Sequence, residues 1–335
     1  QPGAFLGIVF SKDGQTLYVS GGNEDAIYRY AWHDRRATFI DRIVLAAREP
    51  DKMGSRFPAG MALAPDGKRL LVAENLSDTL AVVDLESGKV VQRLKTDAYP
   101  YEVAVTSRGD VYVSAWGGDT VSAFAFTANG QLAERGKIQV GRHPSAMAAS
   151  ADGSRLFVAS ASTNRIAVVA TRTMRMLAQL EDPPPAGPNE GSTPDALALS
   201  ADGKRLFVAE ADNNAVAVFN LSRRSAGVAG ARGQNRLVGR IPVEWYPAAL
   251  LATGNLLLVL NGKGGGTRPN PQQPMPGRRM TDDSVDYTLG QLNGSITVLP
   301  ADVSRAGLAE LTRRVASANN WNRQQAASSG GPVAT

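Results

Sequence analysis

The stretch DGKRLFVAE at residues 202–210, followed by NNAVAVFN at 213–220, decides the fold of this chain. It predicts a tight Asp-Gly turn, a short apolar strand, a polar turn and a second strand, because glycine takes a positive φ without a steric clash. Closely similar stretches recur as DGKRLLVAE at 66–74 and DGSRLFVAS at 152–160. One small structural unit is therefore repeated along the chain.

The turn glycines of the copies lie at positions 14, 67, 109, 153, 203 and 254, so the repeat recurs every 42 to 53 residues. That period is typical of one four-stranded propeller blade. In the second copy we expect strands over 60–64, 69–73, 79–84 and 90–95. Small residues dominate the first of these strands, which suits the inner strand of a blade. The sequence predicts an all-β propeller of four-stranded blades, with six repeats visible.

Neither the shorter coils of a β-helix nor helical patterns between strands are present. One helix is predicted over 302–318, since Leu308, Leu311 and Val315 recur at helical spacing after a cap at Asp302 or Ser304. We expect a propeller over 1–300, a C-terminal helix over 301–320 and a flexible linker over 321–335. Proline-rich and glycine-rich segments at 182–193 and 262–287 are expected to be long loops.

Composition narrows the function classes. A chain of 335 residues with 43% hydrophobic residues can bury a large core, and the lack of cysteine excludes disulfides and thiolate chemistry. The net charge is +5, but the basic residues are dispersed, so no nucleic-acid partner is expected. No apolar run is long enough to predict a membrane span. The chain starts with Gln1, which is compatible with a removed signal peptide or with an excised segment; we expect a periplasmic or secreted protein.

The repeat pattern at 202–209 and 213–218 resembles the YVTN-type β-propeller family over residues 3 to about 300. A narrower resemblance rests on 240–247, 260–264 and 268–271, with a helix that ends at Asn319-Asn320. These segments are similar to the N-terminal propeller of bacterial two-domain proteins that continue into a phosphoesterase domain of the alkaline phosphatase superfamily. The resemblance implies that this chain is the propeller half. Such propellers usually have seven blades. Two possibilities therefore stay open: a further blade lies upstream of this chain, or six blades close by themselves.

The blades of a propeller surround a central channel. On one face, at the mouth of this channel, two sets of loops converge: those that enter each inner strand and those that join the second and third strands. The entering loops share an x-Pro motif, at 57–58, 99–100, 143–144, 193–194 and 246–247. The candidate ligand-binding residues at this channel mouth are Glu74, Glu102, Trp116, His143, Asp195, Glu210, Trp245, Tyr246, Asn261, Lys263 and Arg268.

Two interpretations of these residues stay open. In the first, the carboxylates of Glu74, Glu102, Asp195 and Glu210, with His143, hold a hard metal ion such as calcium or act as general acid and base, as in propeller lactonases. In the second, proline sets the backbone before each strand, the aromatic residues pack on the rim and the acids are solvated. Sequence spacing alone gives no distances between blades.

Other catalytic patterns are weak. The two histidines, His33 and His143, lie in different repeats, and no Gly-x-Ser-x-Gly elbow is present to expose a nucleophile. The loop at 262–267 lacks the Walker spacing. Its Lys263, with Arg268, Arg278 and Arg279, favours a phosphorylated ligand or an acidic partner surface.

These observations favour a non-catalytic binding scaffold from an exported bacterial protein. It would dock a phosphoesterase domain or another protein, or capture a small anionic ligand. The alternative is a metal-dependent hydrolase of the lactonase or esterase type with its site at the channel mouth. No catalytic residue is assigned and no cofactor is predicted, although calcium or another divalent metal stays open.

Overall fold

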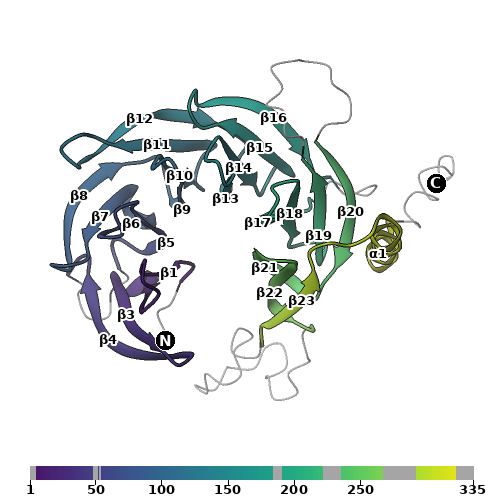
Figure 1. Ribbon diagram of the computed structural model, residues 1–335, viewed down its shortest axis with the longest axis horizontal. Helices are drawn as coiled ribbons and strands as arrows, with labels where there is room; N and C mark the ends of the chain where they lie inside the picture. Colours follow the sequence, from purple (N-terminus) through teal and green to yellow (C-terminus); the bar gives the residue numbers. More distant parts are fainter. Residues whose placement is uncertain are drawn as a thin grey trace, which may run out of the picture. The chain divides into compact units, whose positions relative to one another are not determined.

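The computed structural model describes residues 5–47, 52, 54–183, 191–221, 235–266 and 292–321. In these segments the chain forms six antiparallel sheets in sequence order, five of four strands and the last of three (Figure 1). Each sheet corresponds to one sequence repeat, which confirms the predicted six-repeat propeller. The chain divides into two compact units, Gln1–Leu180 and Glu181–Thr335, with four blades in the first and two blades plus the helix in the second.

The first unit contains four blades of four strands. Their strands are β1 (Ile8–Phe10), β2 (Thr16–Ser20), β3 (Ala26–His33) and β4 (Arg36–Val44); β5 (Pro58–Leu63), β6 (Arg69–Glu74), β7 (Thr79–Asp84) and β8 (Lys89–Lys95); β9 (Pro100–Val105), β10 (Val111–Ala115), β11 (Thr120–Phe126) and β12 (Leu132–Gln139); β13 (Pro144–Ala149), β14 (Arg155–Ser160), β15 (Arg165–Ala170) and β16 (Arg175–Glu181). Short 3-10 turns, η1 (Gly22–Glu24) and η2 (Asn75–Ser77), join the second and third strands of the first two blades.

The second unit holds the fifth blade, the sixth blade and the C-terminal helix. Its elements are β17 (Pro194–Leu199), β18 (Arg205–Glu210), β19 (Ala215–Asn220) and β20 (Arg236–Pro242); β21 (Trp245–Thr253), β22 (Leu256–Gly264) and β23 (Ser295–Pro300); and α1 (Arg305–Ala318). The helix packs against β20, and the Ser304 side chain caps its first turn by accepting from the Gly307 N–H. The predicted helix and its Ser304 cap are confirmed.

Alternate residues of the second strand of the second blade pack against its two neighbouring blades. In β6, Leu70 and Val72 belong to an apolar cluster with the first blade, whereas Leu71 and Ala73 belong to one with the third. All four are fully buried. Strands covered on both faces need apolar residues throughout, which explains the unbroken LLVA and LFVA runs in the sequence.

The sixth blade is covered on one face only, as far as the described residues show. Leu257 and Val259 of β22 pack into a cluster with the fifth blade. On the other face Leu260, Ile296 and Val298 are exposed. Among the described residues, no helix has the length and apolar character that a membrane crossing requires.

The x-Pro motif has a structural explanation. The residue before each proline, from Phe57 to Tyr246, has a φ between 48° and 60°, a left-handed conformation that is uncommon outside glycine. At two of these residues a polar side chain from the preceding blade stabilises it: Asp78 accepts the Tyr99 N–H, and Asn214 accepts the Tyr246 N–H, both at 2.9 Å. The motif therefore fixes the entry into the five inner strands that it precedes, as the second interpretation expected of the prolines. Its expectation that the acids are solvated is wrong for Glu74 and Glu210, which are fully buried.

Candidate functional site

Glu74 and Glu210, two of the predicted acids at the channel mouth, lie at the ends of β6 and β18 and are fully buried. Each forms an ion pair inside its own sheet. Arg93 Nε lies 2.9 Å from one Glu74 oxygen, and Arg240 Nε lies 2.8 Å from one Glu210 oxygen. Both carboxylates are therefore held by protein donors, and neither points to an open ligand site.

The fifth blade adds a second acid to this ion pair. Arg240 Nη2 lies 3.4 Å from Asp182 Oδ1 and donates to the Pro183 carbonyl at 2.9 Å, while the guanidinium stacks over Trp321. Burial, and then the charge of Glu210, raise the pKa of Asp182 well above its usual range. Sequence analysis missed Asp182, Arg93 and Arg240, because the partners lie far apart in the chain.

Two further candidates, on the third and sixth blades, are bonded to other protein groups. The Glu102 side chain on β9 accepts the Met147 N–H at 2.7 Å, which links the third blade to the fourth. Asn261 at β22 is buried and donates to Ser295 and Thr297 at 3.2 and 2.9 Å. Its Oδ1 has no partner among the described residues.

Trp116 and His143 do come together. Their rings stack with centroids 4.8 Å apart and an angle of 19° between the planes. His143 Nδ1 lies 2.5 Å from Ser162 Oγ. The backbone of Tyr99 lies beside them, because the Trp116 backbone N–H donates to the Tyr99 carbonyl at 2.9 Å, and the Tyr99 ring lies over Gly117. Sequence analysis selected Trp116 and His143 separately, and missed Tyr99 and Ser162.

In the second unit Asp195 and Tyr246 form a cluster with Asp212, which follows β18. Burial, and then the charge of Asp212, raise the pKa of Asp195 to about 6. Burial, and then the charges of Asp195 and Asp212, raise the pKa of Tyr246. The Asp212 side chain accepts from the Thr193 hydroxyl. No described residue donates a hydrogen bond to the half-buried Asp195 carboxyl, which makes it the least satisfied acid of the cluster.

Lys263 on β22 extends the Asp195 cluster. Its Nζ lies 4.4 Å from the centre of the Tyr246 ring, a cation-π distance. Trp245, next to Tyr246, is exposed. Arg268 lies outside the described residues, as do Arg278 and Arg279, so the anionic-ligand hypothesis stays a prediction. The structure thus brings together three predicted residues, Asp195, Tyr246 and Lys263, and adds Asp212.

Metal binding at the channel mouth also stays a prediction. Within the segments that the structure describes, no three histidine or acidic side chains gather in a group that could hold a metal ion. The predicted acids are instead distributed between ion pairs, such as Glu74 with Arg93, and the Asp195 cluster.

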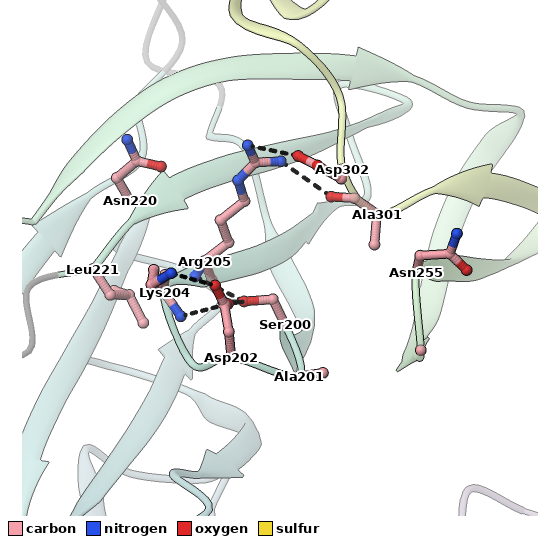
Figure 2. Close-up of a pocket in the computed structure, with 11 residues that line it drawn as sticks. Ser200, Ala201, Asp202, Lys204, Arg205, Asn220, Leu221, Asn255, Ala301 and Asp302 are labelled. Atoms are coloured by element: carbon pink, nitrogen blue, oxygen red, sulfur yellow. Dashed lines mark hydrogen bonds and ion pairs between the residues drawn. The ribbon is translucent and has the colours of Figure 1, made fainter.

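A cavity of about 650 Å³ opens at the end of the fifth blade opposite Asp195, around the turn between β17 and β18 (Figure 2). Its cationic side chains are paired: Lys204 lies 3.1 Å from Asp202, and Arg205 lies 3.2 Å from Asp302. A similar cavity between the second and third blades contains Asp66 and Arg69 at the same repeat positions. The cavity therefore follows from the repeat, and we do not place the candidate site there.

Comparisons with known proteins agree with the fold. Residues 49–162 match the family model described as SMP-30/Gluconolactonase/LRE-like region, about a third of the chain. Among curated proteins, none matches the sequence.

Similar solved structures include a Lactobacillus plantarum protein, at 20% identity and a TM-score of 0.63, covering 76% of each chain. Virginiamycin B lyase from Staphylococcus aureus has 17% identity and a TM-score of 0.57, covering 77% of this chain and 78% of the lyase. A protein from Bacteroides uniformis described as a putative 6-phosphogluconolactonase has 16% identity and a TM-score of 0.60, covering 75% of this chain and 76% of that one. At these identities the likeness shows the β-propeller fold alone, and the phosphoesterase resemblance stays a prediction.

Proposed function

We propose that this chain is a non-catalytic binding propeller, and that the Asp195 cluster (Asp195, Asp212, Tyr246 and Lys263) holds a positively charged nitrogen of a ligand or partner. The observation that carries the proposal is the Asp195 carboxyl, which is half-buried and receives no hydrogen bond from the described residues. A buried polar group without a partner costs free energy unless something satisfies it.

The charge pattern favours a cation. Burial and the neighbouring Asp212 raise the pKa of Asp195 to about 6, so the ionised form is destabilised in the free protein. An ammonium or guanidinium group between the two carboxylates would relieve both the repulsion and the loss of solvation. The Tyr246 ring already carries Lys263 on its face, so the site also has an aromatic wall that suits a cation.

Such a nitrogen has two sources, a small free amine or a lysine or arginine side chain on a docked protein domain. The second source fits the resemblance to propellers that precede a phosphoesterase domain in exported bacterial proteins. We therefore propose that the parent protein is exported, and that the Asp195 cluster faces such a domain.

The small-amine arm is tested by calorimetric titration of spermidine into the purified chain at pH 7.5 and pH 4.5. We expect binding at pH 7.5, weaker binding at pH 4.5, where Asp195 is protonated, and loss of binding in Asp195→Asn. Asp302→Asn removes an exposed acid from the same unit and should bind like the unmodified chain. Equal binding by the Asp195→Asn variant would refute the site.

The protein-docking arm uses gel filtration of the chain with a co-expressed phosphoesterase domain of the alkaline phosphatase superfamily. Co-elution that Asp195→Asn abolishes supports docking through this cluster. Separate elution, with spermidine bound, leaves the small amine as the ligand. Failure of both arms contradicts the proposed function.

A further inference from the structure

We propose a second binding site, on the first unit, in which Tyr99, Trp116 and His143 form an aromatic platform that stacks a sugar ring of a neutral oligosaccharide. The platform comes from the turns around the third blade and shares no residue with the Asp195 cluster. The inference therefore stands whether or not the cluster binds a cation.

The Trp116 and His143 rings stack on each other, and the Tyr99 ring lies over Gly117, the residue next to Trp116. Trp116 is 44% exposed although His143 covers one face of its ring, and Tyr99 is 47% exposed. Large aromatic side chains are usually buried when nothing binds them, because they expose a large apolar area to water. Two neighbouring aromatic residues that stay open while the blade cores are fully packed indicate a surface kept for a ligand.

The platform is held in place by its backbone. Tyr99 and His143 both have a φ of 54°, and the His143 N–H donates to the Gly118 carbonyl at 2.9 Å. The Tyr99 ring lies over Gly117, where an added Cβ would sit 2.4 Å from Tyr99 Cδ2. Only glycine at position 117 lets the Tyr99 ring occupy its place. Because this ring is already positioned in the free protein, it loses little conformational freedom when a ligand binds.

The polar tips of the platform match hydroxyl groups. His143 Nδ1 is taken by Ser162 at 2.5 Å, which leaves Nε2 for a ligand. Among the described residues, none bonds His143 Nε2, the Tyr99 hydroxyl or the Trp116 indole N–H. A pyranose has an apolar C–H face that packs on an indole ring, and equatorial hydroxyls that exchange hydrogen bonds with such donors and acceptors. A neutral sugar therefore satisfies both the ring face and its rim.

The test is calorimetric titration of the chain with soluble β-1,4-linked hexasaccharides of glucose, xylose, mannose and N-acetylglucosamine. We expect at least one to bind, and Trp116→Ala to weaken its affinity roughly tenfold or more, as stacking losses do. Trp116→Phe keeps a stacking ring and should lose less. Phe39→Ala removes an exposed ring of the first blade and should leave the affinity unchanged.

Gly117→Ala is a second variant that removes no platform side chain. The new methyl group displaces the Tyr99 ring, so the affinity should fall while the melting temperature shows that the chain still folds. Binding that is equal in Trp116→Ala and the unmodified chain overturns the proposal. Absence of binding to all four hexasaccharides also overturns the proposal. This holds even where adenosine, an alternative stacking ligand, binds.

Discussion

Arg240 Nε lies 2.8 and 2.9 Å from the two carboxylate oxygens of Glu210 inside the fifth blade. Arg93 makes the same contact with Glu74 in the second blade, at 3.2 and 2.9 Å. In both blades the glutamate ends the second strand and the arginine lies on the fourth strand. A buried ion pair is thus repeated in two blades, and only the fifth blade adds Asp182 to it.

Removal of the arginine should have unequal effects in the two blades. Arg240→Met leaves two buried acids without a cation and should lower the free energy of unfolding by about 3–5 kcal/mol. Arg93→Met should cost less, because Glu74 is the one acid affected and keeps Arg56 at 4.0 Å, and because the Arg93 side chain is 31% exposed against 4% for Arg240. Urea unfolding of the two variants measures the difference, and equal losses would contradict the role of Asp182.

The raised pKa of Asp195 predicts a pH dependence of stability. Its folded value of about 6 lies above the ordinary 3.8, so folding favours the protonated acid. This contribution is complete below about pH 4 and is lost as the pH rises through 6. Asp195→Asn cannot ionise, so it should be more stable than the unmodified chain at pH 7.5, by at most about 3 kcal/mol. Denaturant unfolding at pH 4 and pH 7.5 tests this, and a difference that does not change with pH would contradict it.

A matched pair of valines tests the register of the blades. Val218 pairs with Phe207 on the fifth blade and is 1% exposed, whereas Val298 pairs with Leu258 at the same repeat position of the sixth blade and is 56% exposed. Val218→Ala should lower the free energy of unfolding by about 1–3 kcal/mol through lost packing. Val298→Ala should stay within about 0.5 kcal/mol. Comparable losses in thermal or urea unfolding would show that the faces are wrongly assigned.

The entry into the sixth blade should depend on Asn214, whose side-chain oxygen accepts the Tyr246 N–H at 2.9 Å. Asn214→Ala removes this acceptor and places alanine at a φ of 50°, so it should cost about 2 kcal/mol. Asn214→Asp keeps an acceptor and tolerates the same backbone, so it should cost clearly less. Thermal unfolding distinguishes them, and equal losses would show that the hydrogen bond has no role.

Local sequence patterns predicted most of the fold. The strand expected over 79–84 is β7 with the same bounds, and those expected over 69–73 and 90–95 differ from β6 and β8 by one residue at one end. Turn glycines and alternating apolar residues act within a few positions, so a single repeat already determines its sheet.

The site was less predictable, because its contacts join distant segments. In the sequence, Glu74 and Glu210 cannot be distinguished from exposed acids at the end of a strand. Only the pairing of the fourth strand with the third brings Arg93 and Arg240 beside them. The stack of Trp116 on His143 likewise joins the third blade to the start of the fourth. Its one sequence signal was an aromatic residue near an x-Pro entry, which many packed rims share.

The titration of Asp195 tests the proposed function most directly. The carbon chemical shift of its carboxyl group, followed by NMR from pH 3 to pH 9, should give a pKa of about 6 in the free chain. Saturating spermidine should lower that pKa, because a bound cation favours the ionised acid. A carboxyl that titrates at the ordinary 3.8, or one whose pKa spermidine leaves unchanged, would contradict the account of this cluster as a cation-binding site.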